Sequence, residues 1–186
     1  PRIVILDCGV KYGILRNLLN RGWEVVRVPA DFSAKEILEL KPSVALISNG
    51  PGDPAQATST IETTRQLIGE KLPIIGICLG TQLISLALGA STYKLKYGHR
   101  SQNQPALDLR TGRCYITSQN HGFAVSRDSL NNTGIEALFL NANDQTIEGV
   151  KHTRHRCIAV QFHPEASPGP NDTQFLFDEF LKRGKS

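Results

Sequence analysis

Several features are scarce in this sequence of 186 residues, and their scarcity excludes some classes of protein. It has no Met, one Trp and 6% aromatic residues, so few stacking platforms stand beside its basic side chains, and the formal net charge of +4 is modest. We therefore do not expect nucleic acid as a partner. The four cysteines lack C-x-x-C spacing and favour neither a zinc site nor a disulfide framework, which fits a reducing cytosol.

Long apolar runs are also missing. No run approaches the roughly 18 apolar residues of a membrane span, and no basic-then-apolar leader precedes the first predicted strand, so we expect a cytoplasmic protein without a membrane partner. With 40% hydrophobic residues, the chain is long enough for one domain with a sizeable core and short for two. The start "PRIVILD" indicates one domain of a longer polypeptide, although removal of an initiator Met before Pro would look the same.

Strand and helix patterns alternate from residue 2 to residue 89. Strands separated by helices form right-handed crossovers, so this half predicts a doubly wound, flavodoxin-like α/β sheet with helices on both faces. The expected strands are residues 2–7, 24–28, 43–49 and 73–77. The expected helices are residues 11–22, 33–40 with Ser33 as its cap, 59–70, and one that starts at Cys78 and stops near Gly89.

Short strand-like segments dominate after residue 92 and predict an antiparallel extension of the sheet. They are residues 92–97, 113–118, 122–125, 135–140, 146–152 and 157–163. An amphipathic helix over residues 172–183, with Asp172 as a possible cap, closes the chain. The basic stretch formed by Lys94, Lys96, His99 and Arg100 is interpreted as a solvated face, with docking of a partner as the alternative.

A cysteine between two glycines marks the change from strand to helix in "IIGICLGTQLISLALG". Gly76-Ile77-Cys78-Leu79-Gly80 has the form of a nucleophile elbow with Cys in place of Ser, a turn that needs small neighbours and directs the sulfur away from the sheet. A helix N-terminus also favours the thiolate form of a cysteine. A nucleophile and a buried packing cysteine are both compatible with this position.

Two further loops follow predicted strands, where open α/β sheets place their ligands. In "SNGPGDP", Gly50 and Gly52 allow a backbone N–H to face a neighbouring site, as an oxyanion hole requires, although a tight turn alone would look the same. In "AVQFHPEASPGP", His163 and Glu165 are two residues apart, so the carboxylate can reach the imidazole and orient it as a base. A His and a Glu on an exposed loop is the alternative.

These three loops together resemble those of class I glutamine amidotransferase domains, and the resemblance spans essentially the whole chain. It rests on Gly50-Pro51-Gly52, on the elbow followed by Gln82, and on His163-Pro164-Glu165. "SQNHGFAV", "PEASPGPND" and "YKLKYGHRSQNQP" are similar to the small, glutaminase subunit of carbamoyl phosphate synthetase more than to domains serving GMP, anthranilate or CTP synthesis.

The resemblance implies glutamine hydrolysis through a cysteinyl thioester, with Cys78, His163 and Glu165 as the catalytic residues. The oxyanion would be held by N–H groups of Leu79 and of the Gly50–Gly52 turn. The remaining implied site residues hold the α-amino and carboxylate ends of glutamine; they are Gln82, Asn120, Gly122 and Phe123. For His121, a place in the site and a structural role both stay open.

The resemblance also implies a partner, either a carbamoyl phosphate synthetase large subunit or fused synthetase domains, that receives ammonia for arginine and pyrimidine biosynthesis. No G-x-x-x-x-G-K-[ST] motif is present, so we expect no cofactor and no metal in this chain, and ATP and Mg²⁺ on the synthetase. The small subunits it resembles carry an additional N-terminal domain, which we expect to be absent from residues 1–186. The alternatives are a free-standing Cys-His-Glu hydrolase and a non-catalytic interaction subunit.

Overall fold

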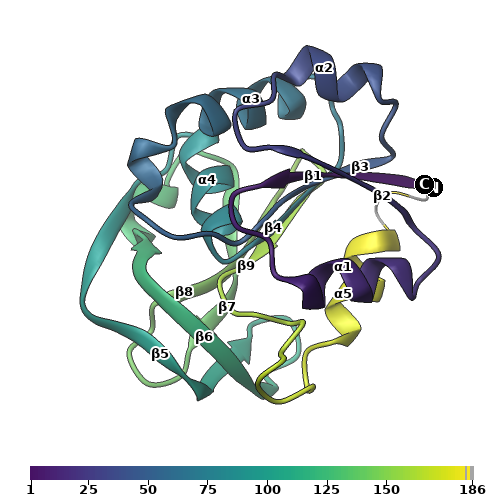
Figure 1. Ribbon diagram of the computed structural model, residues 1–186. Helices are drawn as coiled ribbons and strands as arrows, with labels where there is room; N and C mark the ends of the chain where they lie inside the picture. Colours follow the sequence, from purple (N-terminus) through teal and green to yellow (C-terminus); the bar gives the residue numbers. More distant parts are fainter. Residues whose placement is uncertain (183, 185–186) are drawn as a thin grey trace.

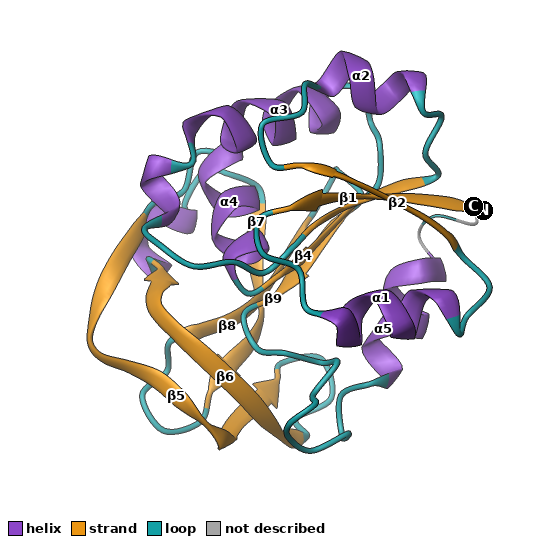
Figure 2. Ribbon diagram, in the orientation of Figure 1, coloured by secondary structure: helices purple, strands orange, loops and turns teal. Residues whose placement is uncertain are grey.

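The computed structural model describes residues 1–182 and 184, and these form one nine-stranded mixed sheet with helices on both faces (Figures 1 and 2). The strand order is β2-β1-β3-β4-β9-β8-β7-β5-β6. The first five strands in that order are parallel: β2 (Glu24–Pro29), β1 (Arg2–Asp7), β3 (Val44–Ile47), β4 (Ile74–Ile77) and β9 (Cys157–Val160). The others pair antiparallel: β8 (Ile147–His152), β7 (Ile135–Asn141), β5 (Thr92–Asp108) and β6 (Cys114–Val125).

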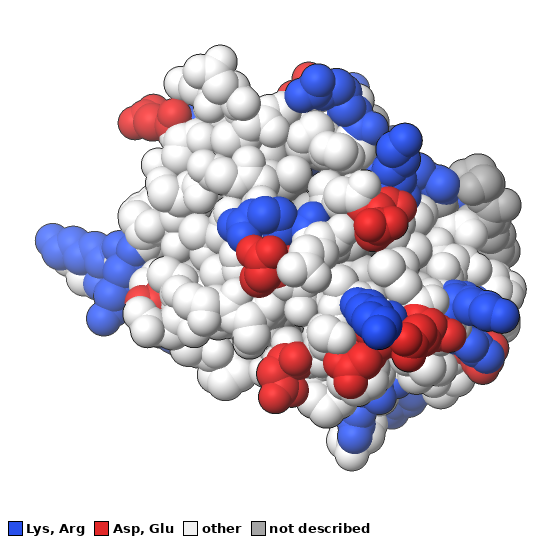
Figure 3. All heavy atoms as spheres, turned by 90° about the horizontal axis from the view of Figure 1, so that it is seen from above, with Lys and Arg blue, Asp and Glu red and all other residues white. Residues whose placement is uncertain are grey.

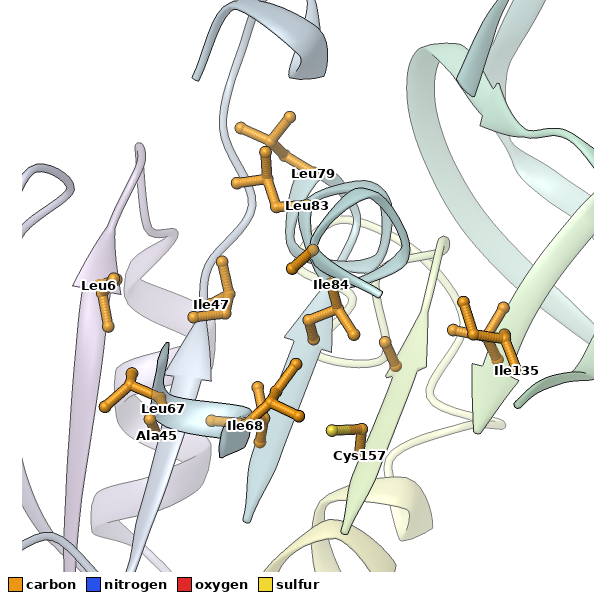
Figure 4. Packing of buried hydrophobic residues seen from close by; sticks show 14 of the residues in the cluster. Leu6, Ala45, Ile47, Leu67, Ile68, Leu79, Leu83, Ile84, Ile135 and Cys157 are labelled. Carbon is orange, nitrogen blue, oxygen red and sulfur yellow. The ribbon is translucent and has the colours of Figure 1, made fainter. Parts of the chain in front are cut away.

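Helices cover the parallel half of the sheet in two layers (Figure 1). One layer contains α2 (Ala34–Glu39), α3 (Thr58–Gly69) and α4 (Leu79–Ala87), and the other contains α1 (Tyr12–Leu19) and α5 (Phe175–Lys182). Side chains of a strand alternate between the two cores: Ala45 and Ile47 of β3 pack toward α3 and α4 (Figure 4), whereas Leu46 packs with the cluster that contains α1 and α5 residues. The β-branched and apolar runs of the central strands are therefore buried on both faces.

Most predicted elements of the first half are confirmed, and the doubly wound fold is confirmed with them. Ser33 caps α2 through a capping box, because its hydroxyl accepts from the Glu36 N–H while the Glu36 carboxylate accepts from the Ser33 N–H. Gly89 follows the end of α4 with φ +94°, a conformation that favours glycine.

Three expectations for the second half need correction. β9 is parallel to β4, so the segment at 157–163 completes the parallel sheet and only its β8 edge is antiparallel. The segments at 113–118 and 122–125 form a single strand, β6, which pairs with a β5 much longer than the predicted 92–97. α5 begins at Phe175, so Asp172 lies in the preceding turn and not at the N-cap, and Arg183 of the predicted helix lies outside the described residues.

The surface seen from above the α2–α3 layer mixes Lys and Arg with Asp and Glu (Figure 3). Basic side chains protrude at the left edge of this view, the side on which β5 lies in Figure 1. Within the described part of the chain, no helix is long and apolar enough to cross a membrane.

Candidate active site

The carboxyl ends of β1, β3, β4 and β9 meet at one edge of the sheet, where they surround a cleft of about 680 Å³. The antiparallel strand β6 closes the opposite wall. The cleft therefore lies between the carboxyl ends of the parallel strands and the antiparallel strand β6, and residues far apart in the sequence meet there. Its lining includes Lys11, Gly50, Gly52, Cys78, Leu79, Gln82, Asn120, His121, Gly122, Phe123 and His163.

Cys78 occupies a strained turn between β4 and α4. Its φ of +54° and ψ of −105° are rare for a residue with a side chain, and it is the N-cap of α4. The turn requires a glycine at position 80, because a Cβ on Gly80 would lie 2.0 Å from the Ile47 carbonyl oxygen of β3. The predicted elbow is present, but the Cys78 side chain is only 4% exposed, so it forms the floor of the cleft.

His163 and Glu165 follow β9 and are both buried, which excludes the exposed-loop alternative. The His163 Nδ1 lies 2.7 Å from the Glu165 Oε1, and the His163 N–H donates to the Ser118 carbonyl of β6 at 2.9 Å. Burial alone would lower the pKa of His163, but hydrogen bonds with Cys78 and Glu165 outweigh burial and raise that pKa to about 9. The sequence spacing therefore produces a linked Cys78–His163–Glu165 triad.

Lys11 adds a second contact to the carboxylate of this triad. Its Nζ lies 2.9 Å from the Glu165 Oε1 and donates to the Ala166 carbonyl at 2.8 Å. Burial opposes ionisation of Glu165, yet the hydrogen bonds and charges of His163 and Lys11 keep its pKa below the ordinary value. Glu165 is thereby held as an anion facing the imidazole.

Two backbone segments provide donors beside Cys78. Leu79 is the first residue of α4, where backbone N–H groups have no acceptor within the helix. The Gly50–Gly52 turn follows β3, the neighbour of β4, and a Cβ on Gly50 would lie 2.2 Å from the Cys8 carbonyl oxygen. Asn49 anchors the turn, since its Nδ2 donates to the Gly9 carbonyl and its Oδ1 accepts from the Lys11 N–H.

The predicted substrate-binding residues form the wall opposite the turn. Asn120, Gly122 and Phe123 lie on β6, and the Asn120 carbonyl oxygen is 4.0 Å from the Cys78 Sγ. Gln82 on α4 donates from Nε2 to the Phe123 carbonyl at 2.8 Å, so it is a buried amide that fixes the wall and not a helix-surface residue. Nine of the ten predicted site residues therefore line one cleft, and the tenth, Glu165, is buried behind His163.

His121 also lines the cleft and is buried. Its Nδ1 lies 2.8 Å from the Phe123 carbonyl oxygen. Burial lowers the pKa of His121 to about 4, so the ring is neutral near pH 7 and Nδ1 donates to that carbonyl.

Other groups near the cleft were not predicted as site residues. Cys8 adjoins the Gly50 turn, but burial raises the pKa of its thiol to about 11, which disfavours a second thiolate. Among the described residues, His99, His121 and Glu148 bring one potential metal-ligating atom each within 4.8 Å of one another.

A family model described as "Glutamine amidotransferase class-I" matches residues 4–183. The chain belongs to this family. This glutamine amidotransferase domain is 55% identical over 181 residues to a carbamoyl phosphate synthase small chain of Methanopyrus kandleri. It is 56% identical over 181 residues to one of Methanocaldococcus jannaschii. These matches cover 97% of this chain and 50% and 51% of the relatives, so the chain spans about half the length of the curated relatives it matches.

Solved structures share the fold of this amidotransferase domain. A putative GMP synthase subunit from Thermoplasma acidophilum has a TM-score of 0.84 at 21% identity, covering 99% of this chain and 94% of that one. A glutamine amidotransferase from Thermotoga maritima has a TM-score of 0.70 at 15% identity, covering 99% and 85%.

Two functional contacts of this domain were missed from sequence. Lys11 follows β1, so the rule that ligands gather at the carboxyl ends of strands could have suggested it. His99 was assigned to a solvated basic face, but it is buried and contacts two carboxylates from residues 144 and 148. Nothing in the local sequence around His99 indicates those distant partners.

Proposed function

We propose that this chain hydrolyses glutamine to glutamate and ammonia through a thioester on Cys78 and supplies the ammonia to a carbamoyl phosphate synthetase. The observation that carries the proposal is the buried Cys78–His163–Glu165 triad at the floor of a cleft with backbone donors beside the sulfur. The family and the identity to carbamoyl phosphate synthase small chains support this choice.

In the first step, the Cys78 thiolate attacks the side-chain carboxamide carbon of glutamine, and the N–H groups of Leu79 and of the Gly50–Gly52 turn stabilise the oxyanion. His163, protonated and held by Glu165, gives its proton to the departing nitrogen, so the C–N bond breaks and ammonia leaves. His163 then accepts a proton from water, whose oxygen attacks the thioester carbon. Glutamate forms, and the Cys78 sulfur is released.

Substrate positioning falls to the β6 wall in this proposal. Asn120, Gly122 and Phe123 present backbone groups to the cleft, and Gln82 holds the Phe123 carbonyl. These groups would bind the α-amino and carboxylate ends of glutamine. The chain uses no cofactor or metal of its own, and ATP and Mg²⁺ bind the synthetase.

The partner in this proposal is a carbamoyl phosphate synthetase large subunit or a fused synthetase domain, in a pathway toward arginine and pyrimidines. Ammonia released in bulk water would be protonated and lost, so the chemistry requires a sheltered path to an acceptor. Two open alternatives are the glutaminase domain of another amidotransferase and a free-standing hydrolase.

The decisive test compares Cys78→Ala with Cys157→Ala, a buried cysteine on β9 that does not line the cleft. We expect Cys78→Ala to lose all measurable glutaminase activity while the synthetase complex still uses free ammonia. Cys157→Ala should stay active and show any cost of removing a buried sulfur. Glutamate release by Cys78→Ala near the wild-type rate would contradict the proposal.

A further inference from the structure

A buried polar cluster lies directly behind the substrate-binding wall. We call it the His99 cluster, and its members are His99, Gln119, His121, Asp144 and Glu148. His99 of β5 is paired with His121 of β6, and the two rings meet edge to face with centroids 4.9 Å apart. The cluster thus joins the core of the antiparallel half to the wall of the cleft.

Both ring nitrogens of His99 face oxygen atoms. Nε2 is 2.7 Å from the Asp144 Oδ2, and Nδ1 is 3.1 Å from the Glu148 Oε1 and 3.0 Å from the Gln119 Oε1. With both carboxylates ionised, the imidazolium form of the ring, which donates from both nitrogens, satisfies all of these oxygen atoms. The hydrogen bond with Glu148 is the largest cause that raises the pKa of His99 to about 9; burial opposes it and Asp144 adds to it.

Glu148 has an unusual environment for a carboxylate. It is 0% exposed, and its Oε2 has no hydrogen-bond partner among the residues that the structure describes. Burial favours a proton on Glu148, but the contacts of His99 with two carboxylates favour keeping that proton on the ring. A buried carboxylate with an unpaired oxygen is destabilising.

Gln119 transmits the position of His99 to the wall. Its Nε2 donates to the Thr117 Oγ1 at 3.1 Å, which directs Oε1 toward His99 Nδ1 and also places it 2.9 Å from the His121 Nε2. The His121 Nε2 contacts the Gln119 oxygen on one side of the ring, and its Nδ1 contacts the Phe123 carbonyl oxygen on the other. The His121 ring therefore links the Gln119 oxygen, which His99 holds from the other side, to the Phe123 carbonyl.

We propose that His99 is a positioning residue whose imidazolium, held by Asp144 and Glu148, fixes Gln119 and thereby the His121–Phe123 segment that binds substrate. This inference rests on the proposed function, since the segment must bind glutamine for its position to matter. Without the His99 N–H, the Gln119 oxygen loses the donor that holds it, so the His121 ring and the Phe123 carbonyl that Gln82 also holds are less firmly fixed.

A divalent cation is the competing occupant, because His99, His121 and Glu148 are ligand types for Zn²⁺. The distances favour the proton, since His99 Nδ1 lies at ordinary hydrogen-bond distances from both Glu148 and Gln119. Titration of metal-free Cys78→Ala protein with Zn²⁺ separates the two. Stoichiometric Zn²⁺ binding that Glu148→Gln abolishes would overturn the proton-based proposal.

The main experiment measures glutaminase kinetics for His99→Phe, with His152→Phe as the matched control. His152 is also a buried histidine that contacts a backbone carbonyl, that of Thr133, but it does not line the cleft. We expect His99→Phe to raise KM for glutamine about tenfold with kcat changed less than about threefold. Alkylation of Cys78 by iodoacetamide should keep its wild-type rate, and His152→Phe should leave KM unchanged.

Glu148→Gln is a second variant, which tests the inference if the His99→Phe protein does not fold. We expect its KM to rise about threefold or more while its resistance to urea stays equal or increases, because a buried charge is removed. If Glu148 had only a structural role, Glu148→Gln would lower the stability and raise KM together. Wild-type KM in both variants, or KM rising only where stability falls, would overturn the inference.

The two proposals fail separately. A wild-type protein that hydrolyses no glutamine, alone or with its synthetase subunit, contradicts the proposed function. An active wild type with unchanged KM in His99→Phe contradicts only the role of His99. Direct binding of glutamine to the Cys78→Ala and the Cys78→Ala/His99→Phe chains gives the same comparison without turnover.

Discussion

At the scale of single residues, the triad combines a local feature with a long-range one. His163 and Glu165 are two positions apart, so their 2.7 Å contact could be predicted from sequence, but the backbone forms a turn there, with the Ala166 N–H donating to the His163 carbonyl at 3.1 Å, and not the expected extended segment. Their alignment with Cys78, 85 positions earlier than His163, depends on the pairing of β4 with β9. Their burial, which the exposed-loop alternative did not anticipate, comes from β6 through the Ser118 contact.

The first prediction separates the roles of the pair. His163→Asn removes the group that carries the proton, whereas Glu165→Gln removes only its orientation and charge. We expect kcat for glutamine to fall about two orders of magnitude further in His163→Asn than in Glu165→Gln. Steady-state kinetics of both variants give the comparison, and a larger loss in Glu165→Gln would show that the roles are assigned incorrectly.

The second prediction concerns pH. The pKa values of His99 and His163 are raised to about 9, above the unfolded value near 6.5, so each contributes stability that is fully present below about pH 6.5. That stability is lost as the pH rises through about 9. We expect the free energy of unfolding, measured in urea, to fall over this window, and to fall less in Glu148→Gln, where the His99 pKa is raised less. An equal fall in both proteins would contradict the assignment.

At the scale of elements, local rules predicted the helices and the four parallel strands of the first half well, but they assigned β9 to the antiparallel extension. The α2 start is an example, because Ser33 and Glu36 are close enough in sequence to form their capping box without help from the rest of the chain. Strand β5 could not be predicted in full, since "GHRSQNQP" shows neither apolar alternation nor freedom from Gly and Pro. Its strand conformation comes from pairing with β6 and β7.

The same limit applied to the His99 cluster. The partners of His99 are 45 and 49 positions away on the β7–β8 turn and on β8, and only the assembled sheet brings them together. The glycines of the elbow could be predicted as small residues, but the contacts that require them come from other elements: a Cβ on Gly76 would meet Ile84 of α4 and Ala159 of β9. Gly80 leaves room for the Ile47 carbonyl oxygen, which no local pattern indicates.

The third prediction tests that contact. A Cβ in Gly80→Ala would lie 2.0 Å from a backbone oxygen, so β3 and α4 must move apart. We expect the variant to be less stable by about 3 kcal/mol or more and to lose glutaminase activity. Gly69→Ala at the end of α3 is the control, because a Cβ there meets nothing within 4 Å, and it should change stability by less than about 1 kcal/mol. Similar costs at the two positions would refute the packing argument.

At the scale of the whole molecule, the cleft lies between two differently built halves. The Gly50–Gly52 turn, Cys78 and His163 follow parallel strands, whereas Asn120, Gly122 and Phe123 lie on β6, the last strand of the sheet order. Cys78 lies on the floor of the cleft and the substrate-binding wall lies on the edge strand β6, so a partner protein that binds at this edge affects the two differently. A partner that contacts β5 or β6 acts on the wall directly and reaches the triad only through β6, by way of the backbone contact between Ser118 and His163.

The last prediction follows from that separation. The proposed partner would order the β6 wall against a triad that is already assembled, so its main effect should be on how often bound glutamine reaches the Cys78 sulfur in a reactive orientation. We therefore expect slow hydrolysis by the chain alone and a gain in kcat, larger than any change in KM, when the synthetase subunit is added. Steady-state assays with and without that subunit measure the gain, and Cys78 alkylation by iodoacetamide, which needs no substrate wall, should change little. Full activity in the chain alone, unchanged by the synthetase subunit, would rule out this coupling. It would favour a free-standing hydrolase, because such an enzyme has no acceptor for its ammonia and needs no partner to control the release.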